Sequence, residues 1–415
     1  AKPSKFRNGS CIMLTLNCAP VEPPAPPSPT PSTLSILTDE GSSDKSKTGS
    51  ATASDFECEF NSSGSSLPPK KQIILLDVGE GTATQMFQSV GCDLARFDEL
   101  LLSVKLIWIS HHHADHITGV PMLLQQIKRA RMRQESRSAN SIEAIFHTSI
   151  RRIPTVSKYD MRSMYASGGY ERGKVMIIGS EPVLKYFEFS ACAAGLDDLV
   201  TFSPIVKTLY AGATKEIVAA TEGVITRLRS IPVQHCQSSY GLVLDFKSTH
   251  KIVYSGDCRP SQSLVKAGMD CDLLIHEATF DDSKYEDAVK KRHSTSSEAR
   301  RIAQQMRAKH SILTHFSQRY PVEASTSSLQ MTSAHNRSTI SIEEELLHHQ
   351  QQVDHHTNRS FPAVSVAYDF LRFAFPSQVK ELPRITSAMG TLLTALEEER
   401  KARDHPTTAQ SLQFT

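Results

Sequence analysis

The sequence lacks the features that mark several large classes of protein. It has no run of 18 consecutive apolar residues, which excludes a transmembrane helix, and we expect no membrane partner. The net charge is only +2, because 46 Lys and Arg face 44 Asp and Glu. This balance excludes a strongly basic protein that holds nucleic acid by bulk charge, although it is compatible with a local basic groove. No internal repeat is evident.

Cysteine pairs are missing as well. None of the eight cysteines forms a C-x-x-C pair, so we expect reduced thiols rather than zinc ribbons or a small disulfide scaffold. The chain has no initiating methionine and no signal peptide, and it begins at Ala1 as though cut from something longer. Its 415 residues are 39% hydrophobic, which is enough for two or three domains or for one large α/β domain with insertions.

Two stretches have a composition that does not support a packed core. Residues 17–70 hold nine of the 21 prolines and a Ser-rich polar run, and residues 322–360 are rich in His, Gln and Ser. Such segments bury too little apolar surface to offset the entropy of ordering them. We expect two disordered insertions in one catalytic domain formed by residues 1–16 and 71–377, followed by a helical tail over residues 378–415. A metal-binding role for the histidines of the second insertion is the alternative.

Short apolar runs alternate with helical patterns between these insertions. The runs are too short for helices and rich in Ile, Leu and Val, which is typical of buried strands. They span residues 11–16, 71–77, 106–110, 250–257, 272–278 and 311–315. The clearest helix is predicted at residues 295–309, where Thr295 and Glu298 have the spacing of a capping box. This alternation indicates a layered α/β fold.

Four candidate metal ligands follow one of the expected strands. In H-H-H-A-D-H they are His111, His113, Asp115 and His116, whose imidazoles and carboxylate all suit Zn²⁺. Four ligands within six residues are more than one tetrahedral site takes easily from so short a loop. We therefore predict two ions, with His111 and His113 on one and Asp115 and His116 on the other. His112 is not expected to be a ligand, and a purely structural cluster is the alternative.

Three further candidates lie at expected strand ends. They are His235, Asp257 and His315, and Asp257 could bridge two cations through its two carboxylate oxygens. Each is a weak signal alone, because a single histidine at a strand end is more often a satisfied polar residue. The complete candidate set has seven ligands: His111, His113, Asp115, His116, His235, Asp257 and His315.

The order of these seven residues resembles that of the metallo-β-lactamase superfamily, whose fold is an αββα sandwich with two zinc ions at its edge. Other motifs are similar to those of the tRNase Z (ribonuclease Z) family, within the C-terminal, catalytic half of the eukaryotic long form. They are PSKFRN (3–8), LLDVGEGT (75–82), HCQSSYG (235–241), YSGDCRP (254–260), HEAT (276–279), HST (293–295), THFSQRY (314–320) and AYD (367–369).

The sequence departs from the family pattern in a few places. A Gly-Thr-Gly-Ser turn is missing before PSKFRN, which we interpret as an N-terminal cut. The long form also has an amino-terminal half that carries a tRNA-gripping arm, and we expect that half to be a partner of this chain. Cys258 stands where threonine is usual and Ser239 where alanine is usual, and neither change removes a ligand.

The resemblance implies a zinc-dependent endoribonuclease that removes the 3′ trailer from precursor tRNA, in the nucleus or the mitochondrion. The products would be a tRNA with a 3′-hydroxyl and a trailer with a 5′-phosphate. Two zinc ions per chain would lower the pKa of a shared water from 15.7 towards about 7.

The same resemblance implies roles for individual residues. Asp115 would hold the attacking water and accept its proton, and His293 would protonate the leaving 3′-oxygen while Glu277 orients it. The structural alternatives, without a catalytic role, are that Glu277 caps the following helix and that His293 is an ordinary loop residue.

Four more residues are implied around this machinery. Lys5 and Arg7 would face the RNA end, and Arg319 would lie near the phosphate or the discriminator base. Asp77 would orient a ligand histidine from behind.

Two other functions are compatible with parts of the sequence. One is another superfamily hydrolase that acts on a thioester, a lactam or a small phosphodiester, and the other is an inactive scaffold. HEAT and HST argue against thioester or lactam hydrolysis, which needs no such acid pair, and the complete ligand set argues against a scaffold.

Overall fold

The computed structural model describes residues 11–18, 70–138, 173–209, 215–316, 353–354, 359–360, 363–367 and 371–388. The chain divides into two compact units, one formed by Ala1–Leu16 with Lys71–Thr415 and the other by Asn17–Lys70. Almost all of the smaller unit lies outside the described residues. In the second predicted insertion the described residues form two short antiparallel strands, β11 (Val353–Asp354) and β12 (Arg359–Ser360). Disorder in the two insertions stays a prediction.

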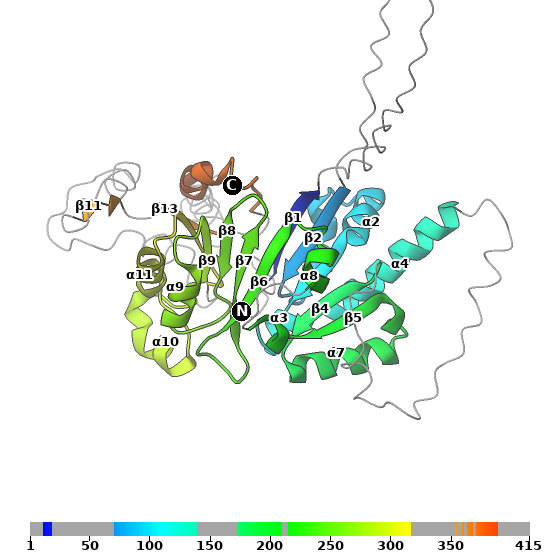
Figure 1. Cartoon of the computed structure of the whole chain (residues 1–415), viewed down its shortest axis with the longest axis horizontal. Helices are drawn as coiled ribbons and strands as arrows, with labels where there is room; N and C mark the ends of the chain where they lie inside the picture. The colour runs from blue at the N-terminus through cyan, green and yellow to red at the C-terminus, as the bar shows by residue number, and fades with distance from the viewer. Residues whose placement is uncertain are drawn as a thin grey trace, which may run out of the picture. The chain divides into compact units, whose positions relative to one another are not determined.

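Two β-sheets form the centre of the larger unit (Figure 1). The first has the order β1 (Ile12–Cys18), β2 (Lys70–Leu76), β3 (Val104–Trp108), β4 (Val175–Gly179) and β5 (Val200–Pro204). The second has the order β13 (Ala363–Val366), β10 (His310–Thr314), β9 (Leu273–Glu277), β8 (Lys251–Tyr254), β7 (Tyr240–Phe246) and β6 (Ile225–Pro232). Strands β2 to β5 run parallel, as do β8, β9, β10 and β13, so the ends of these strands collect at common edges.

The sheets pack against each other through a shared apolar layer. Leu76 and Trp108 of the first sheet belong to the same buried cluster as Leu242 and Ile275 of the second. The buried Trp108 side chain also donates a hydrogen bond from its indole Nε1 to the Ser230 hydroxyl across this interface, at 3.0 Å. Because successive residues of a strand face opposite sides, the neighbours of these residues point the other way, towards helices.

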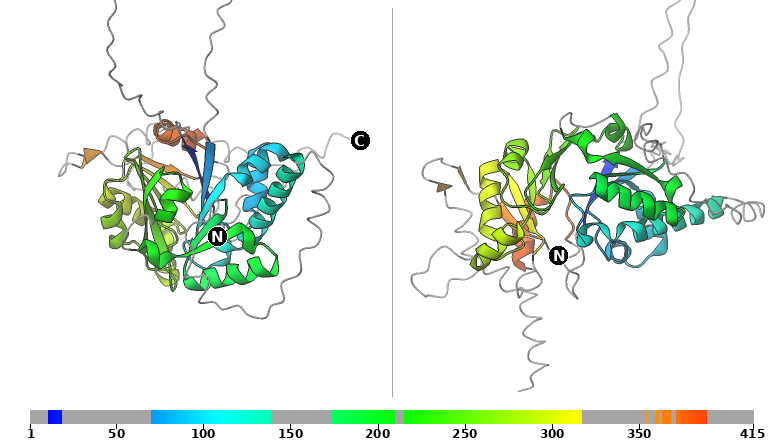
Figure 2. Two further views of the ribbon diagram at one scale, coloured as in Figure 1. Left: turned by 45° about the vertical axis from the view of Figure 1, so that its right-hand side comes forward. Right: turned by 90° about the horizontal axis from the view of Figure 1, so that it is seen from below.

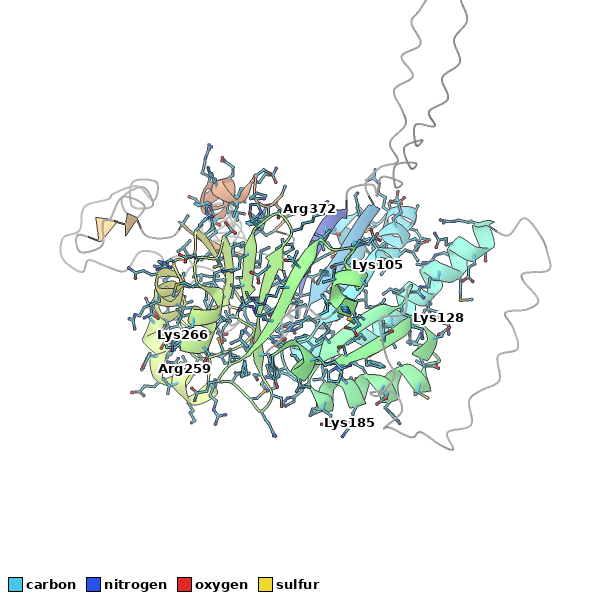
Figure 3. The ribbon with its side chains drawn as sticks, viewed as in Figure 1. Lys105, Lys128, Lys185, Arg259, Lys266 and Arg372 are labelled. Atoms are coloured by element: carbon cyan, nitrogen blue, oxygen red, sulfur yellow. The ribbon has the colours of Figure 1, made fainter. Side chains whose placement is uncertain are left out.

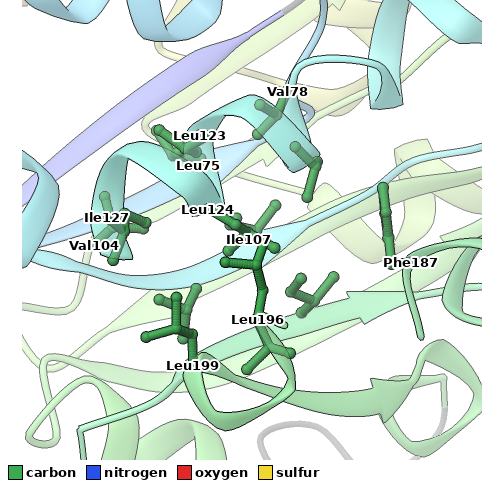
Figure 4. Close-up of a cluster of buried hydrophobic side chains, with 14 of the residues drawn as sticks. Leu75, Val78, Val104, Ile107, Leu123, Leu124, Ile127, Phe187, Leu196 and Leu199 are labelled. Atoms are coloured by element: carbon green, nitrogen blue, oxygen red, sulfur yellow. The ribbon is translucent and has the colours of Figure 1, made fainter. Parts of the chain in front are cut away.

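Helices cover the outer face of the first sheet (Figure 2). They are α1 (Thr82–Ser89), α2 (Leu94–Leu102), α4 (Val120–Ser138) and α7 (Glu181–Ala193). In this layer Leu75 and Ile107 from the sheet lie in one cluster with Ile127 of α4 and Phe187 of α7 (Figure 4). Strands covered on both faces have no polar side, which explains the continuous apolar runs in the sequence.

Other helices cover the second sheet. In α9 (Gln262–Gly268) and α11 (Ser296–Met306), apolar side chains such as Leu264 and Ile302 join Val253 in a third buried cluster. The remaining short elements are α3 (Ala114–Ile117), α8 (Lys215–Ala220), α10 (Tyr285–Lys291) and 3₁₀ turns at Asp197–Leu199, Ile205–Thr208, Asp282–Lys284 and Val379–Glu381. The layers therefore run helix, sheet, sheet, helix, which confirms the predicted αββα sandwich.

The predicted C-terminal helical tail is described only at its start. Residues 382–388 are helical, and residues 389–415 lie outside the described part of the chain. None of the described helices is both long enough and apolar enough to cross a membrane.

Candidate metal centre

All seven predicted ligands lie shortly after strands, five of them in loops and two, Asp115 and His116, in the short helix α3, and the fold brings these segments together. The H-H-H-A-D-H loop leaves β3, and His235 follows β6. Asp257 follows β8, and His315 comes directly after β10. One sheet thus supplies four of the candidates, and the other sheet supplies three from three separate strands.

The first group of donors consists of three histidines. His111 Nε2 lies 2.9 Å from His113 Nδ1, and His235 Nε2 lies 3.1 Å from the same atom. A tetrahedral zinc ion with bonds of about 2.0–2.1 Å needs ligand nitrogens roughly 3.3 Å apart. The three nitrogens are therefore close to the spacing that one such ion requires.

The second group combines one carboxylate with two histidines. Asp115 Oδ2 lies 3.7 Å from His116 Nε2 and 3.5 Å from His315 Nε2. The side chains of His116 and His315 are buried, while that of Asp115 is 21% exposed, so Asp115 is the member of this group that solvent can reach. Asp115 and His116 lie on the same side of the site, and their assignment to one ion stays a prediction.

Asp257 lies between the two groups. Its Oδ2 is 3.8 Å from the Nε2 atoms of both His111 and His235, and 3.3 Å from His116 Nε2. Its Oδ1 is 3.4 Å from His315 Nε2. Within the described part of the chain, Oδ1 and His116 Nε2 are buried atoms with no hydrogen-bond partner. Buried polar atoms rarely stay in that condition, and cations at the two groups would satisfy both. The donor set fits two metal ions, although the assignment of the seven residues as ligands stays a prediction.

The ionisation of the histidines also suits metal binding. Burial lowers the pKa of His113 to about 4 and that of His315 to about 3, so both are neutral at pH 7 and keep a lone pair for a cation. His116 behaves differently. Burial disfavours its charged form, but the carboxylates of Asp257 and Asp77 outweigh burial and raise its pKa to about 10. A cation at His116 Nε2 would therefore displace a proton.

Asp77 is not a candidate ligand, but it orients the candidate ligand His116 through a hydrogen bond. Its buried Oδ2 accepts hydrogen bonds from His116 Nδ1, the Ser110 hydroxyl and the Tyr254 hydroxyl, each at 2.8 Å. Its backbone has a φ of 58°, which lies in the left-handed region that a non-glycine residue seldom adopts. Because Nδ1–H of His116 is occupied by Asp77, the other ring nitrogen faces the candidate metal site.

Three groups that the sequence did not single out orient other histidines. The Ser110 hydroxyl lies 2.9 Å from His111 Nδ1, and the Thr279 hydroxyl lies 2.9 Å from His315 Nδ1. The backbone carbonyl of Arg292 accepts from His235 Nδ1 at 2.9 Å. Ser110 precedes the ligand loop and Thr279 closes HEAT, so their positions were a signal. A backbone carbonyl leaves no mark in a sequence.

A carboxylate–histidine pair lies beside the candidate ligands. Glu277 Oε1 accepts from His293 Nδ1 at 2.8 Å, and His293 Nδ1 is 4.0 Å from Asp257 Oδ2. Glu277 also accepts from the backbone N–H groups of Cys258 at 2.8 Å and Thr279 at 3.1 Å, so it caps no helix. Burial opposes a charge on His293, but the Glu277 carboxylate outweighs it and raises the pKa of His293. The pair can therefore hold a proton at neutral pH.

The three residues predicted to contact RNA cannot be placed. Lys5, Arg7 and Arg319 all lie outside the described residues. Their role stays a prediction.

Comparisons with known proteins identify the family of the chain. A model of the Metallo-beta-lactamase superfamily matches residues 69–166, and a model of the Beta-lactamase superfamily domain matches residues 188–316. Between them these matches include all seven candidate ligands and the Glu277–His293 pair. The chain belongs to the metallo-β-lactamase superfamily.

Within the superfamily, the predicted resemblance to the tRNase Z family is confirmed. The chain is 34% identical over 247 residues to Zinc phosphodiesterase ELAC protein 2 of Macaca fascicularis, which is 60% of this chain and 26% of that protein. It is 32% identical over 249 residues to Ribonuclease Z 2, mitochondrial, of Schizosaccharomyces pombe, which is 60% of this chain and 30% of that protein. The chain thus spans less than a third of the length of these two relatives.

A solved structure of a long form RNase Z from yeast has a similar fold. It superposes with a TM-score of 0.52 at 20% identity and covers 80% of this chain and 40% of its own. At that identity the likeness supports the fold alone.

Proposed function

We propose that this chain is a zinc-dependent endoribonuclease that removes the 3′ trailer from precursor tRNA. The observation that carries the proposal is the Glu277–His293 pair beside a complete set of metal-ligand candidates. Hydrolysis of an RNA phosphodiester creates a poor leaving group, the ribose 3′-oxygen, which needs a proton. A partly buried histidine with a raised pKa next to the candidate metal site can supply that proton.

The ligand candidates would hold two zinc ions. His111, His113 and His235 would bind one, Asp115, His116 and His315 would bind the other, and Asp257 would lie between them. When bound, the ions would activate water and offset the negative charge of the reacting phosphate. The zinc phosphodiesterase name of one relative supports the choice of zinc.

The residues of the chain would move the protons. The oxygen of a water attacks phosphorus, and Asp115, whose carboxylate solvent can reach, accepts the proton of that water. The bond from phosphorus to the ribose 3′-oxygen breaks, and His293 donates its proton to that oxygen while Glu277 stabilises its charged form. The products are a tRNA with a 3′-hydroxyl and a trailer with a 5′-phosphate.

The relatives support a proposal for the substrate and the partner. The names ribonuclease Z and tRNase Z support an RNA substrate, and we propose precursor tRNA, with Lys5, Arg7 and Arg319 near its end. Because the relatives are much longer, we also propose that an amino-terminal half assists binding. Three relatives are named as mitochondrial, which supports the mitochondrion as a location, and the nucleus is proposed on the resemblance alone.

One experiment tests the activity directly. The purified chain is incubated with a 3′-extended tRNA, with and without a metal chelator, and the new RNA end is mapped. We expect cleavage at the base of the trailer that the chelator abolishes, and about two zinc ions per chain by elemental analysis. Absence of cleavage together with near-zero zinc would mean a scaffold. Turnover of a lactoyl thioester but not of bis-p-nitrophenyl phosphate would mean another hydrolase of the superfamily.

A further inference from the structure

One partly buried ion pair contacts several of the elements around the proposed proton donor. The guanidinium of Arg259 forms a two-pronged contact with the Glu298 carboxylate, in which Nη1 donates to Oε2 at 2.7 Å and Nη2 donates to Oε1. The side chains are only 13% and 11% exposed, so this Arg259–Glu298 pair is held largely away from water. Paired forks of this kind are short, directional and hard to distort.

Arg259 ties the pair to the backbone of His293. The same Nη1 donates to the His293 carbonyl at 2.6 Å, and the Arg259 backbone N–H donates to the Gln234 carbonyl at 2.9 Å. Arg259 lies two residues after Asp257, and Gln234 lies one residue before His235. Arg259 therefore links the backbone of His293 to two loops that carry metal-ligand candidates.

Glu298 ties the pair to the start of α11. Glu298 Oε2 accepts from the Thr295 backbone N–H at 3.0 Å, and the Thr295 hydroxyl accepts from the Glu298 backbone N–H at 3.3 Å. This is the capping box that the sequence predicted, but its carboxylate has a second use. It fixes Thr295, two residues after His293, and also neutralises Arg259.

A third contact closes the arrangement. The Arg259 guanidinium lies over the Tyr285 ring, 5.6 Å from its centroid, and Tyr285 is the first residue of α10. Figure 3 labels Arg259 on the side of the molecule where α9, α10 and α11 lie. The His293 loop runs from the end of α10 to the start of α11, so one guanidinium contacts a residue in each of the two flanking helices as well as the His293 carbonyl.

From these contacts we propose that Arg259 and Glu298 are positioning residues for His293 and set the reach of its imidazole towards the leaving oxygen. The proposal rests on the proposed function, in which His293 is the acid. A displacement of about 1 Å in such a group can cost about 10²-fold in rate. Neither residue touches the reacting atoms, and neither is a candidate ligand.

The experiment separates positioning from chemistry by the choice of leaving group. Arg259→Met is assayed on 3′-extended tRNA, whose leaving oxygen needs a proton, and on bis-p-nitrophenyl phosphate, whose leaving group is a stable anion. We expect kcat on tRNA to fall about 10²-fold with KM within about threefold, and kcat on the aryl ester to stay within about threefold. Zinc content should not change. Arg259→Lys should recover part of the loss, since an ammonium replaces one prong of the fork.

A direct readout accompanies the kinetics. Amide hydrogen exchange of the peptide that spans residues 292–296 should be at least about fivefold faster in Arg259→Met. Glu298→Gln is the second variant, because an amide oxygen still accepts from Thr295 but the charge is lost. Glu298→Gln can replace Arg259→Met in the experiment if the latter does not fold. It should show the same loss of kcat on tRNA without a loss of kcat on the aryl ester.

The other end of α11 supplies a matched control. Arg307 makes a comparable fork with Asp270, with Nε at 2.6 Å from Oδ1, but this pair is exposed and far along the helix from His293. Arg307→Met removes the same charge and should leave both activities and the exchange unchanged within about twofold.

The outcomes are distinct. Equal losses on both substrates, or unchanged exchange and kcat in both Arg259→Met and Glu298→Gln, would overturn the positioning role. If the wild-type chain cleaves no tRNA, the proposed function fails instead. The exchange of residues 292–296 in the variants then decides whether the pair holds the loop.

Discussion

The candidate active site has two halves that are built in different ways. In the metal half, four of the seven ligand candidates come from one short loop, and Asp77 and Ser110 hold that loop from behind. In the acid half, Glu277 and His293 come from different elements, and their geometry depends on contacts among several loops. The first half is built around a local motif that three residues from separate strands complete, and the second depends on tertiary contacts throughout.

This difference implies different chemical failures. Damage to the metal half should stop attack on any phosphodiester, because every substrate needs an activated water. Damage to the acid half should harm only substrates whose leaving oxygen needs a proton. The predictions below use pairs of substrates to test that separation.

The largest effect is expected for Asp115→Ala. Asp115 is the solvent-reachable carboxylate of the second donor group, at 3.5 Å from His315 Nε2, and it is proposed both as a ligand and as the proton acceptor. Cleavage of 3′-extended tRNA should fall more than about 10³-fold, and turnover of bis-p-nitrophenyl phosphate should fall with it. Initial rates on both substrates provide the measurement. Cleavage of tRNA at a near wild-type rate would sink the site assignment.

A smaller and selective effect is expected for His293→Ala. Removing the proton donor should lower kcat on tRNA by about 10²- to 10³-fold, while kcat on the aryl ester changes little and zinc content stays the same. Parallel kinetics and elemental analysis check this. A loss of zinc in His293→Ala would instead place His293 among the ligands. This alternative is compatible with the distance of 4.0 Å between His293 Nδ1 and Asp257 Oδ2.

The secondary-structure elements that carry the site could largely be predicted from the sequence. The strand predicted at residues 311–315 is observed at His310–Thr314, and the helix predicted at residues 295–309 is observed at Ser296–Met306. Buried strands and a capped amphipathic helix have strong local patterns. Strand β4 has the same apolar pattern but was not predicted, because no candidate ligand follows it to draw attention to that run.

The contacts that orient the site were harder to foresee. Ser110 and Thr279 act through hydroxyls whose partners lie on other elements, and Arg292 acts through its backbone carbonyl. Such groups have no spacing rule, because they meet their partners only when two loops pack together. The spacing of Thr295 and Glu298 predicted a helix start correctly, yet nothing in the sequence indicated that Glu298 also binds Arg259.

A moderate effect on the metal half is expected for Asp77→Asn. The amide keeps the shape of the side chain but loses the charge that fixes His116 Nδ1 and accepts from Tyr254. Zinc affinity should fall about 10- to 100-fold, as happens when a carboxylate behind a ligand histidine is neutralised. Competition with a chromophoric chelator measures it. Unchanged affinity would show that Asp77 serves the fold and not the metal.

The smallest effect is a shift in pH dependence for Glu277→Gln. Burial by itself would lower the pKa of His293, and the Glu277 carboxylate raises it above its ordinary value. His293 therefore stays protonated to a higher pH than a free histidine, and activity on tRNA should decline as pH rises through this raised pKa. Without the carboxylate the pKa of His293 falls, so the alkaline limb of kcat should move to lower pH, while the limb for the aryl ester should not move. Profiles of kcat against pH for both substrates measure the shift. An identical displacement of the alkaline limb on both substrates would mean that Glu277 acts on the metal half instead. The two halves would then not be functionally distinct.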